Sequence, residues 1–371
     1  MTTTSSPNIP NNHIQIGGRK SQLAVRQSEI VRDYIIGKYP HLSCSILALS
    51  TLGDKVQSKP LYSFGGKALW TKELEILLLE QIEEYPQLDL IVHSLKDMPT
   101  NLPDEFELGC ILDRQDPTDA LVMKKGSSYK TLKDLPDGSV VGTSSVRRSS
   151  QLLKNYPKLK FESVRGNLQT RISKLDSENS PFECLILASA GLQRVGLGNR
   201  ITCSLQAPDM YYAVGQGALG VEIRKDDYLM KEILRSIEDL PTTYCCLAER
   251  SLMRHLEGGC SVPIGVHTNF NQETNELIFK GLVVSPDGTQ SVEDELITKI
   301  NNKNDAEQAG INLGDLLISK GGKEILNAIN FEKINQPPSP VPSVASSEPA
   351  IIEDQHHPNP THDDLIKVAI N

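Results

Sequence analysis

Three short segments of the sequence combine basic side chains with hydroxyl groups or glycines where a predicted strand gives way to a helix. They are Gly17–Ser21, His93–Asp97 and Thr143–Arg148. Backbone N–H groups and hydroxyls at the start of a helix bind anions, and arginine adds bidentate donors. Each segment alone is equally typical of a helix cap with solvated basic side chains. Together, at the carboxyl ends of strands, they predict an anion-binding site.

The charge of the chain is unevenly distributed. Overall, 38 Lys and Arg face 47 Asp and Glu, a net charge of −9 that excludes a surface built as a whole for nucleic acid or anionic lipid. Residues 144–200 nevertheless hold ten basic and four acidic residues, a net charge of +6. This stretch predicts a pocket for a polyanionic small molecule. A nucleic-acid-binding face is the weaker alternative, because aromatic residues make up only 5% and no nucleic-acid-binding motif occurs.

Asp97 is the best-placed acid for catalysis, because it directly follows Lys96 at the end of a predicted strand. A carboxylate among arginines can stabilise a developing positive charge or relay a proton. A helix cap that balances the charge of Lys96 fits the same spacing, so both interpretations stay open on the residues alone.

Cys260 differs from the other six cysteines because it follows a helix end and two glycines, on a turn that can expose its thiol. Nearby Arg254 or His255 would favour the thiolate. A small buried hydrophobic residue is the usual alternative for a lone cysteine. No metal site is predicted, since a zinc site assembled from the neighbouring thiols and imidazoles lacks any recognised ligand spacing. That rejected set is Cys245, Cys246, Cys260, His255 and His267.

The segment Gly215–Gly220 matches the G-x-G-x-x-G pattern of dinucleotide-binding proteins. That pattern requires a strand before it and a helix after it. Here residues 221–224 have the character of a strand, so we expect close backbone packing near a domain hinge rather than NAD binding.

Short β-type runs alternate with amphipathic helical stretches from His13 onward, which predicts an α/β fold with open, mostly parallel sheets. Expected strands are 13–17, 44–50, 88–94, 139–145, 160–164 and 184–189; expected helices are 21–38, 72–85 with Thr71 as N-cap, 146–156 and 168–175. After Thr242 the pattern changes to a helix at 244–256, three strands joined by polar turns and a helix at 305–319. This predicts an α+β module with an antiparallel sheet.

The two ends of the sequence differ in composition from the rest. Residues 1–12 have no Arg or Lys and no apolar core, so we expect neither a signal nor a transit peptide. Residues 335–371 hold seven prolines, five acids and one lysine, which predicts a disordered tail. No apolar run is long enough to span a membrane. The odd number of scattered cysteines, seven, favours reduced thiols and a cytoplasmic protein.

A series of motifs resembles the porphobilinogen deaminase (hydroxymethylbilane synthase) family, transferases of tetrapyrrole and heme biosynthesis. The motifs occur in order from residue 13 to about residue 334, so the resemblance covers nearly all of the chain outside its two ends. Gly18 is a departure, because many family members carry a hydroxyl residue there. The motifs are GGRKSQLA (17–24), STLGDK (50–55), WTKELE (70–75), VHSLKDMPT (92–100), GTSSVRR (142–148), RGNLQTR (165–171), ASAGLQR (188–194), YAVGQGALG (212–220) and HLEGGCSVP (255–263).

The resemblance implies two domains like type II periplasmic binding proteins, which close on a cleft, and a small α+β C-terminal domain. Residues 13–114 with 214–238 would form a discontinuous domain 1, residues 115–213 domain 2, and residues 239–334 domain 3. Residues 1–12 and 335–371 would be disordered. Residues 58–67 resemble the family's mobile loop, and the protein would be a monomer.

The resemblance also implies a chemistry. Cys260 would hold a dipyrromethane cofactor through a thioether, and Asp97, with Lys96, would act in catalysis by helping ammonia leave and stabilising an azafulvene cation. Four porphobilinogen molecules would be joined head to tail, and the linear hydroxymethylbilane released by hydrolysis. The side chains implied to bind carboxylates of cofactor and substrate are Arg19, Gln27, Lys96, Ser144, Ser145, Arg147, Arg148, Arg165, Arg171 and Arg194.

A non-catalytic anion-binding protein of the same two-lobed fold is the alternative in a different class. It predicts reversible carboxylate binding and no covalent adduct, so the intact mass of the protein separates the two hypotheses.

Overall fold

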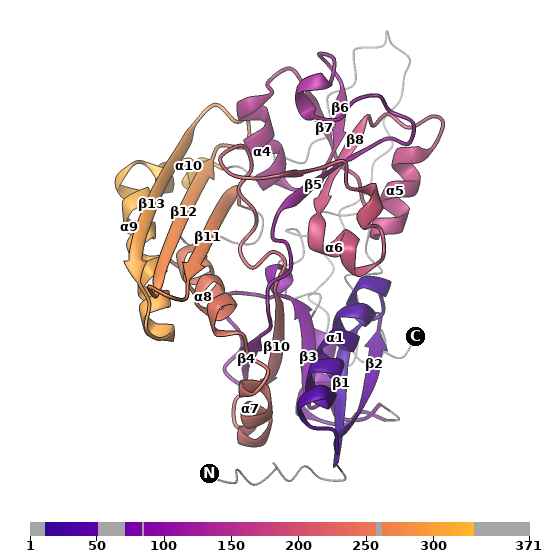
Figure 1. The fold of residues 1–371 in the computed structure, drawn as a ribbon, viewed down its shortest axis with the longest axis vertical. Helices are drawn as coiled ribbons and strands as arrows, with labels where there is room; N and C mark the ends of the chain where they lie inside the picture. Colours follow the sequence, from indigo (N-terminus) through magenta and orange to yellow (C-terminus); the bar gives the residue numbers. More distant parts are fainter. Residues whose placement is uncertain (1–11, 51–70, 84, 257–261, 330–371) are drawn as a thin grey trace, which may run out of the picture.

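The computed structural model describes residues 12–50, 71–83, 85–256 and 262–329, in which three β-sheets are arranged around a common junction (Figure 1). In Figure 1 the first sheet lies at the bottom, the second at the upper right and the third, antiparallel sheet at the left. The expectations for the two ends of the chain, for the loop at 58–67 and for Cys260 lie outside the described residues.

The first sheet has five strands in the order β2-β1-β3-β10-β4. β1, β2 and β3 are mutually parallel, while β10 runs antiparallel to both β3 and β4. Its apolar core includes the fully buried Ile14, Ile35 and Val221. The elements are β1 (His13–Arg19), α1 (Gln22–Lys38), β2 (Ser43–Leu49), α3 (Lys72–Leu79), β3 (Leu90–Ser94), η4 (Leu95–Asp97), β4 (Phe106–Ile111), β10 (Leu219–Arg224) and α7 (Tyr228–Arg235).

The second sheet has the corresponding order β7-β6-β8-β5-β9, with β5 antiparallel to its two neighbours. Separate apolar clusters cover its two faces, one around Leu121 and Ile186 and one around Val122 and Leu187. The elements are β5 (Asp119–Met123), η5 (Leu132–Asp134), β6 (Val140–Gly142), α4 (Val146–Asn155), β7 (Lys160–Glu162), α5 (Leu168–Asp176), β8 (Cys184–Ala188), α6 (Ser189–Arg194), η6 (Gly198–Arg200) and β9 (Cys203–Leu205).

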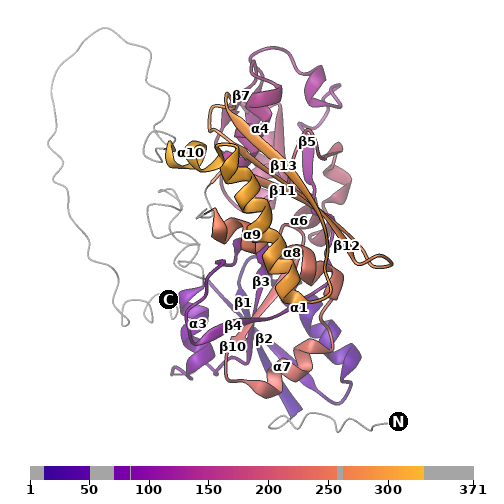
Figure 2. The same cartoon turned by 90° about the vertical axis from the view of Figure 1, so that its left-hand side faces the viewer.

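The third sheet is antiparallel in the order β11-β12-β13, as the sequence predicted. Two long helices pack on one of its faces, and Figure 2 shows α9 lying across the strands with α8 beside it. Leu252, Phe279 and Leu313 are fully buried between them. The elements are α8 (Leu240–His255), β11 (Ile264–Asn271), β12 (Glu276–Val284), β13 (Ser291–Lys299), α9 (Lys303–Ser319) and α10 (Gly322–Asn327).

The predicted α/β fold class is therefore confirmed. The first two sheets are mixed rather than mostly parallel, because each has two parallel and two antiparallel pairings of neighbouring strands. Several local predictions also differ from the structure. Thr71 occupies the N-cap position of α3 as predicted, but its side chain makes no capping hydrogen bond. It has helical backbone angles (φ −116°, ψ −28°), and its hydroxyl hydrogen-bonds the Glu75 carboxylate instead. Helix α8 begins at Leu240 rather than at residue 244, because the Asp239 carboxylate accepts a hydrogen bond from Thr242 N at 2.9 Å. Strand β6 is short because residues 143–145 already form the turn into α4.

The chain crosses between the sheets at residues 112–118 and 213–218, and a buried ion pair holds this junction. Arg114 Nη1 lies 2.6 Å from Glu249 Oε1, and Arg114 Nη2 lies 3.1 Å from Glu249 Oε2. Glu249, in α8, is fully buried and also accepts from Gly215 N at 2.8 Å. Burial lowers the pKa of Arg114, but Glu249 outweighs this and raises the pKa well above its usual value. The pair therefore ties the crossing segments to the C-terminal module.

The Gly215–Gly220 segment forms part of the junction and does not open a helix, which agrees with the packing interpretation. Gly217 has a φ of +89°, and a Cβ atom there would lie 2.3 Å from the carbonyl oxygen of Gln115. Only glycine fits this close crossing of the two chain segments.

The Arg114–Glu249 pair gives a stability prediction. Glu249→Gln leaves the Arg114 charge buried without its carboxylate, so we expect the free energy of unfolding to fall by about 3–5 kcal/mol. Chemical denaturation of the two proteins measures the difference. Lys158→Ala removes an ion pair with Asp137 whose partners are 74% and 72% exposed, and it should leave the denaturation midpoint unchanged. Equal effects of the two substitutions would contradict the role given to the junction pair.

Candidate active site

The ends of β1 and β3 place the first group of predicted residues at one edge of the first sheet. β1 and β3 are parallel neighbours with Gly17 opposite Ile91, so Arg19 and Ser94 end their strands on the same side. Gln27, buried on α1, donates from Nε2 to Ser94 Oγ at 2.7 Å. A Cβ atom at Gly18 would lie 2.6 Å from Ser28 Oγ, so a side chain there would require Ser28 to shift.

Lys96 and Asp97 follow directly, in the short helix η4. Lys96 Nζ donates to Gln216 Oε1 at 3.3 Å, and burial lowers the pKa of Lys96 to about 8. Asp97 opposes this shift and Arg148 adds to it, so the ammonium group lies in the field of both. The side chain of Asp97 is exposed, in contrast to its neighbour. The structure thus places an accessible carboxylate beside a partly desolvated amine.

Arg147 and Arg148 converge on one buried carboxylate, Asp119. Arg147 Nη1 lies 2.8 Å from Asp119 Oδ2, and Arg148 Nε donates to Asp119 Oδ1 at 2.9 Å. Burial acts to raise the pKa of Asp119, but the two arginines outweigh it and hold the pKa well below its usual range. Gln216 Nε2 also donates to Asp119 Oδ1, at 3.0 Å. The carboxylate therefore links both arginines to the residue that binds Lys96.

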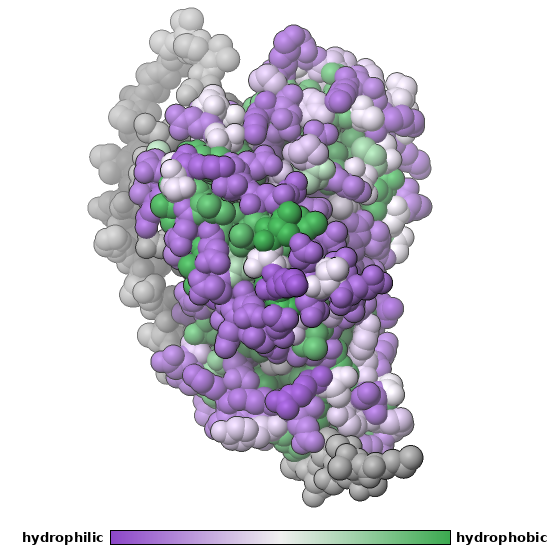
Figure 3. All heavy atoms as spheres, turned by 60° about the vertical axis from the view of Figure 1, so that its left-hand side comes forward, coloured by the Kyte–Doolittle hydropathy of each residue, from purple (hydrophilic) through white to green (hydrophobic). Residues whose placement is uncertain are grey.

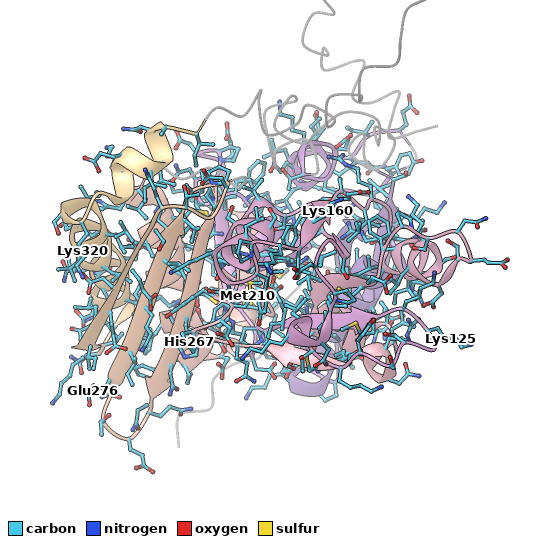
Figure 4. The ribbon with its side chains drawn as sticks, turned by 90° about the horizontal axis from the view of Figure 1, so that it is seen from above. Lys125, Lys160, Met210, His267, Glu276 and Lys320 are labelled. Carbon is cyan, nitrogen blue, oxygen red and sulfur yellow. The ribbon has the colours of Figure 1, made fainter. Side chains whose placement is uncertain are left out.

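Both arginines make further contacts within the chain. Arg147 Nη1 donates to the carbonyl oxygen of Tyr211 at 2.5 Å and lies 3.7 Å from Met210 Sδ. Figure 4 shows Met210 between the second and third sheets. Arg148 Nη1 donates to the carbonyl oxygen of Ile186 at 2.9 Å. Arg147 thus ties the start of α4 to residues 210–211, and Tyr211 in turn packs on Leu282 and Val284 of the third sheet. These contacts come in addition to the anion-binding role expected from the sequence.

Arg171 and Arg165 come from the segment that starts α5. Arg171 Nε donates to the carbonyl oxygen of Gly166 at 2.7 Å, and burial lowers the pKa of Arg171 to about 10. Arg148 and Arg165 contribute to this decrease and Asp97 opposes it, which brings these four charges into one neighbourhood. Asn167 starts the helix by accepting from Thr170 N at 2.8 Å.

Arg194 is the last residue of α6, which follows β8 without an intervening loop. Its Nη2 donates to the carbonyl oxygen of Gly217 at 2.7 Å, and burial lowers its pKa to about 10. Its Nε is buried and has no hydrogen-bond partner among the residues that the structure describes. A desolvated cationic donor of this kind favours an anionic partner.

The two serines lie at the start of α4. Ser144 is exposed, and its Oγ donates to the carbonyl oxygen of Val164 at 2.8 Å. Ser145 is the half-buried N-cap residue of α4, and its hydroxyl makes no capping hydrogen bond. The hydroxyl of Ser145 is therefore available at a helix start, where a carboxylate is stabilised.

The structure adds three residues that sequence reasoning missed: Asp119, Gln216 and Glu249. Asp119 is the polar first residue of an otherwise apolar buried strand, and that was its only local signal. Gln216 lay inside a motif analysed for nucleotide binding, and Glu249 inside an ordinary helical pattern. Gln216 and Glu249 act through partners 120 and 135 positions away, Lys96 and Arg114. Asp119 binds arginines 28 and 29 positions away and Gln216 at a separation of 97 positions.

The donor set fits a polycarboxylate cofactor. Burial lowers the pKa values of Arg171 and Arg194, and their hydrogen bonds within the described chain go to backbone carbonyls, which carry no counter-charge. A dipyrromethane carries several carboxylates, and arginine binds each of them with two parallel N–H donors.

Within the parts of the chain that the structure covers, no helix is both long and apolar enough to cross a membrane.

The sequence matches two family descriptions and many curated relatives. Residues 14–232 match "Porphobilinogen deaminase, dipyromethane cofactor binding domain", and residues 243–319 match the porphobilinogen deaminase C-terminal domain. The porphobilinogen deaminase of Debaryomyces hansenii is 76% identical over 332 residues, which cover 90% of this chain and 92% of that protein. That of Saccharomyces cerevisiae is 59% identical over 322 residues, which cover 86% of this chain and 98% of that protein.

Among solved structures, the periplasmic VFT2 domain of Bordetella pertussis BvgS is similar to this chain with a TM-score of 0.36 and 11% identity, covering 64% of this chain and 93% of that one. The family matches span nearly all of the described residues. The chain belongs to the porphobilinogen deaminase family, transferases of tetrapyrrole synthesis that act on porphobilinogen and have a dipyrromethane cofactor-binding domain.

Proposed function

We propose that this chain joins four porphobilinogen molecules head to tail on a dipyrromethane attached to Cys260 by a thioether, and then releases linear hydroxymethylbilane by hydrolysis. Each addition forms one carbon–carbon bond and breaks the carbon–nitrogen bond of an aminomethyl group, so ammonia leaves and one pyrrole carbon loses a proton. The observation that carries the proposal is the cluster of desolvated cations around Asp97. It matches a reaction in which every added pyrrole brings two more carboxylates.

The attached dipyrromethane would supply the nucleophilic pyrrole carbon to which the first substrate adds. Asp97 would stabilise the positive charge that develops at the substrate's pyrrole nitrogen as ammonia leaves, because it is the exposed carboxylate of the cluster. Lys96 would assist by orienting a carboxylate and by holding a proton nearby. The side chains proposed to bind carboxylates are Arg19, Gln27, Lys96, Ser144, Ser145, Arg147, Arg148, Arg165, Arg171 and Arg194.

The proposed domains are residues 13–114 with 214–238, residues 115–213 and residues 239–334. The sheet order supports the discontinuous first domain, because β10 pairs with β3 and β4 although the second sheet lies between them in the sequence. The separate apolar clusters of the three sheets support the same division.

We also propose a cytoplasmic monomer. Six cysteines among the described residues are free thiols, which favours a reducing compartment. Hydrophilic side chains cover most of the face drawn in Figure 3, with smaller apolar areas between them, which is typical of a surface exposed to water.

The thioether is tested by intact-mass measurement. We expect the purified protein to exceed its sequence mass by one dipyrromethane and the Cys260→Ser protein to lack that increment and be inactive. Cys44→Ser serves as the matched control, since Cys44 is a half-buried thiol whose pKa burial raises to about 11. It should keep both the adduct and the activity. A wild-type protein of unmodified mass that does not consume porphobilinogen would disprove the proposal.

The role of Asp97 is tested by Asp97→Asn, which removes the charge and preserves the shape. We expect kcat to fall by about 100-fold or more, the usual contribution of a positioned acid or base. Thermal unfolding should be unchanged, because the side chain is exposed. Asp137→Asn, an exposed aspartate of the second sheet's surface, is the control and should keep wild-type kcat. Near-wild-type turnover by Asp97→Asn would remove Asp97 from the mechanism.

The lowered pKa of Lys96 predicts that kcat/KM depends on pH. With a pKa of about 8, Lys96 is protonated below that pH and loses its charge above it, so carboxylate binding should weaken on the alkaline side. We expect kcat/KM to fall above about pH 8, and Lys96→Arg to move that fall upward by more than one pH unit, because arginine stays protonated. Lys125→Arg, on an exposed loop, should leave the profile unchanged (Figure 4). If kcat/KM of Lys96→Arg falls at the same pH as that of the wild type, the fall is caused by a group other than Lys96.

A further inference from the structure

One stripe of helix α8 faces the chain segment that carries Asp97. Cys246, Arg250 and Arg254 are spaced four residues apart, so they lie along the same side of the helix. Cys246 is fully buried in one apolar cluster with Leu95 and Met98, the residues on either side of Lys96 and Asp97. The C-terminal module thus contacts the first sheet at the predicted catalytic segment.

The two arginines of this stripe bind three consecutive carbonyl groups. Arg250, only 3% exposed, donates from Nη1 to the carbonyl oxygen of Met98 at 3.3 Å and from Nη2 to that of Pro99 at 2.6 Å. Arg254 Nη1 donates to the carbonyl oxygen of Thr100 at 3.3 Å. Hydrogen bonds from a charged donor are stronger than those between neutral groups, so these contacts hold the backbone directly after Asp97.

The other side of the segment is also fixed to the junction. Leu95 N donates to the carbonyl oxygen of Ala218 at 3.0 Å, and Lys96 Nζ donates to Gln216. Because the side chain of Asp97 is itself exposed, the position of its carboxylate depends on the backbone between these two attachments. Movement of residues 98–100 would therefore move the carboxylate relative to the cations around it.

We propose that Arg254, together with Arg250, is a positioning residue that sets the place of the Asp97 carboxylate relative to α8. The last residue of α8, His255, precedes Cys260 by five positions, so the same helix leads into the proposed attachment residue. This inference rests on the proposed function. The inference also gives Arg254 a role other than the one considered from the sequence, which was to favour the thiolate of Cys260. The guanidinium of Arg254 hydrogen-bonds Thr100 and Glu307.

Arg254 has a second contact that suggests a purely structural alternative. Its Nη2 lies 3.0 Å from Glu307 Oε1 in α9, so Arg254 also joins two helices of the C-terminal module. If that contact were its whole role, removal of Glu307 would have the same effect as removal of Arg254. The two roles are separable because Glu307→Gln leaves the carbonyl contact with Thr100 in place.

The test compares steady-state kinetics of holoenzyme variants whose intact masses confirm the bound cofactor. In Arg254→Gln we expect kcat to fall about tenfold with KM within about twofold of wild type, since small misplacements of a reacting group reduce the rate strongly. Arg254→Lys, which retains a charged donor, should recover part of the loss. Glu307→Gln should keep kcat within about twofold of wild type.

Arg200→Gln is the matched control in the second sheet. Arg200 also bridges a carboxylate and a carbonyl oxygen, those of Asp176 and Met123, and its exposed fraction of 21% is close to the 29% of Arg254. Its hydrogen bonds go to Asp176 in α5 and Met123 in β5 rather than to the segment that carries Asp97, so Arg200→Gln should keep wild-type kcat. A common loss in both arginine variants would indicate general destabilisation and overturn the inference.

The outcomes for the inference and for the proposed function are distinct. Cofactor-loaded Arg254→Gln with wild-type kcat, or an equal loss of kcat in Glu307→Gln, overturns the positioning role alone. A wild-type protein without an adduct overturns the proposed function and this inference with it. If Arg254→Gln does not fold, an Arg254→Lys holoenzyme with wild-type kcat and KM overturns the positioning role, and a reduced kcat at unchanged KM supports it.

Discussion

The structure depends on one buried carboxylate, Asp119, which makes it possible to gather positive charge where the sheets meet. Two adjacent arginines at the start of α4 would repel each other and lose hydration there without a counter-charge. Asp119 accepts hydrogen bonds from both of them and from Gln216. Through Gln216 the same group reaches Lys96 in the first sheet. Asp119 therefore connects the start of α4 with the segment that carries Lys96.

The local sequence predicted most helices and strands and the fold class, because the spacing of apolar residues and the glycine-containing turns can be recognised within a few neighbouring positions. The edge formed by Arg19 and Ser94 followed from parallel strands that end together, and the antiparallel third sheet followed from alternating residues between polar turns. Boundaries were less accurate, since α3 ends at Leu79 rather than at residue 85 and α8 begins at Leu240 rather than at residue 244. Thr71 has a residue type suited to an N-cap, but its hydroxyl bonds Glu75 within the helix, so the type alone did not fix its role.

Contacts between distant segments could not be predicted from local pattern. The antiparallel placement of β10 depends on the chain returning to the first sheet after completing the second, and no residue within β10 encodes that return. In the same way, Arg114 and Glu249 are separated by 135 positions and meet only because three modules dock. The family motifs supplied what local physics did not, since they brought Asp97, the arginines and Cys260 into one functional hypothesis.

The arginines at the junction divide by the kind of partner that each has. Arg147 and Arg148 share the single negative charge of Asp119, which balances half of their combined charge and fixes their geometry. Arg171 and Arg194 are held by backbone carbonyls, which orient the guanidinium, and among the described residues no carboxylate hydrogen-bonds either of them. An incoming carboxylate gains more from the second pair, because it replaces no internal counter-ion. On this argument the first pair chiefly maintains the site's architecture, and the second pair supplies most of the attraction for a polycarboxylate.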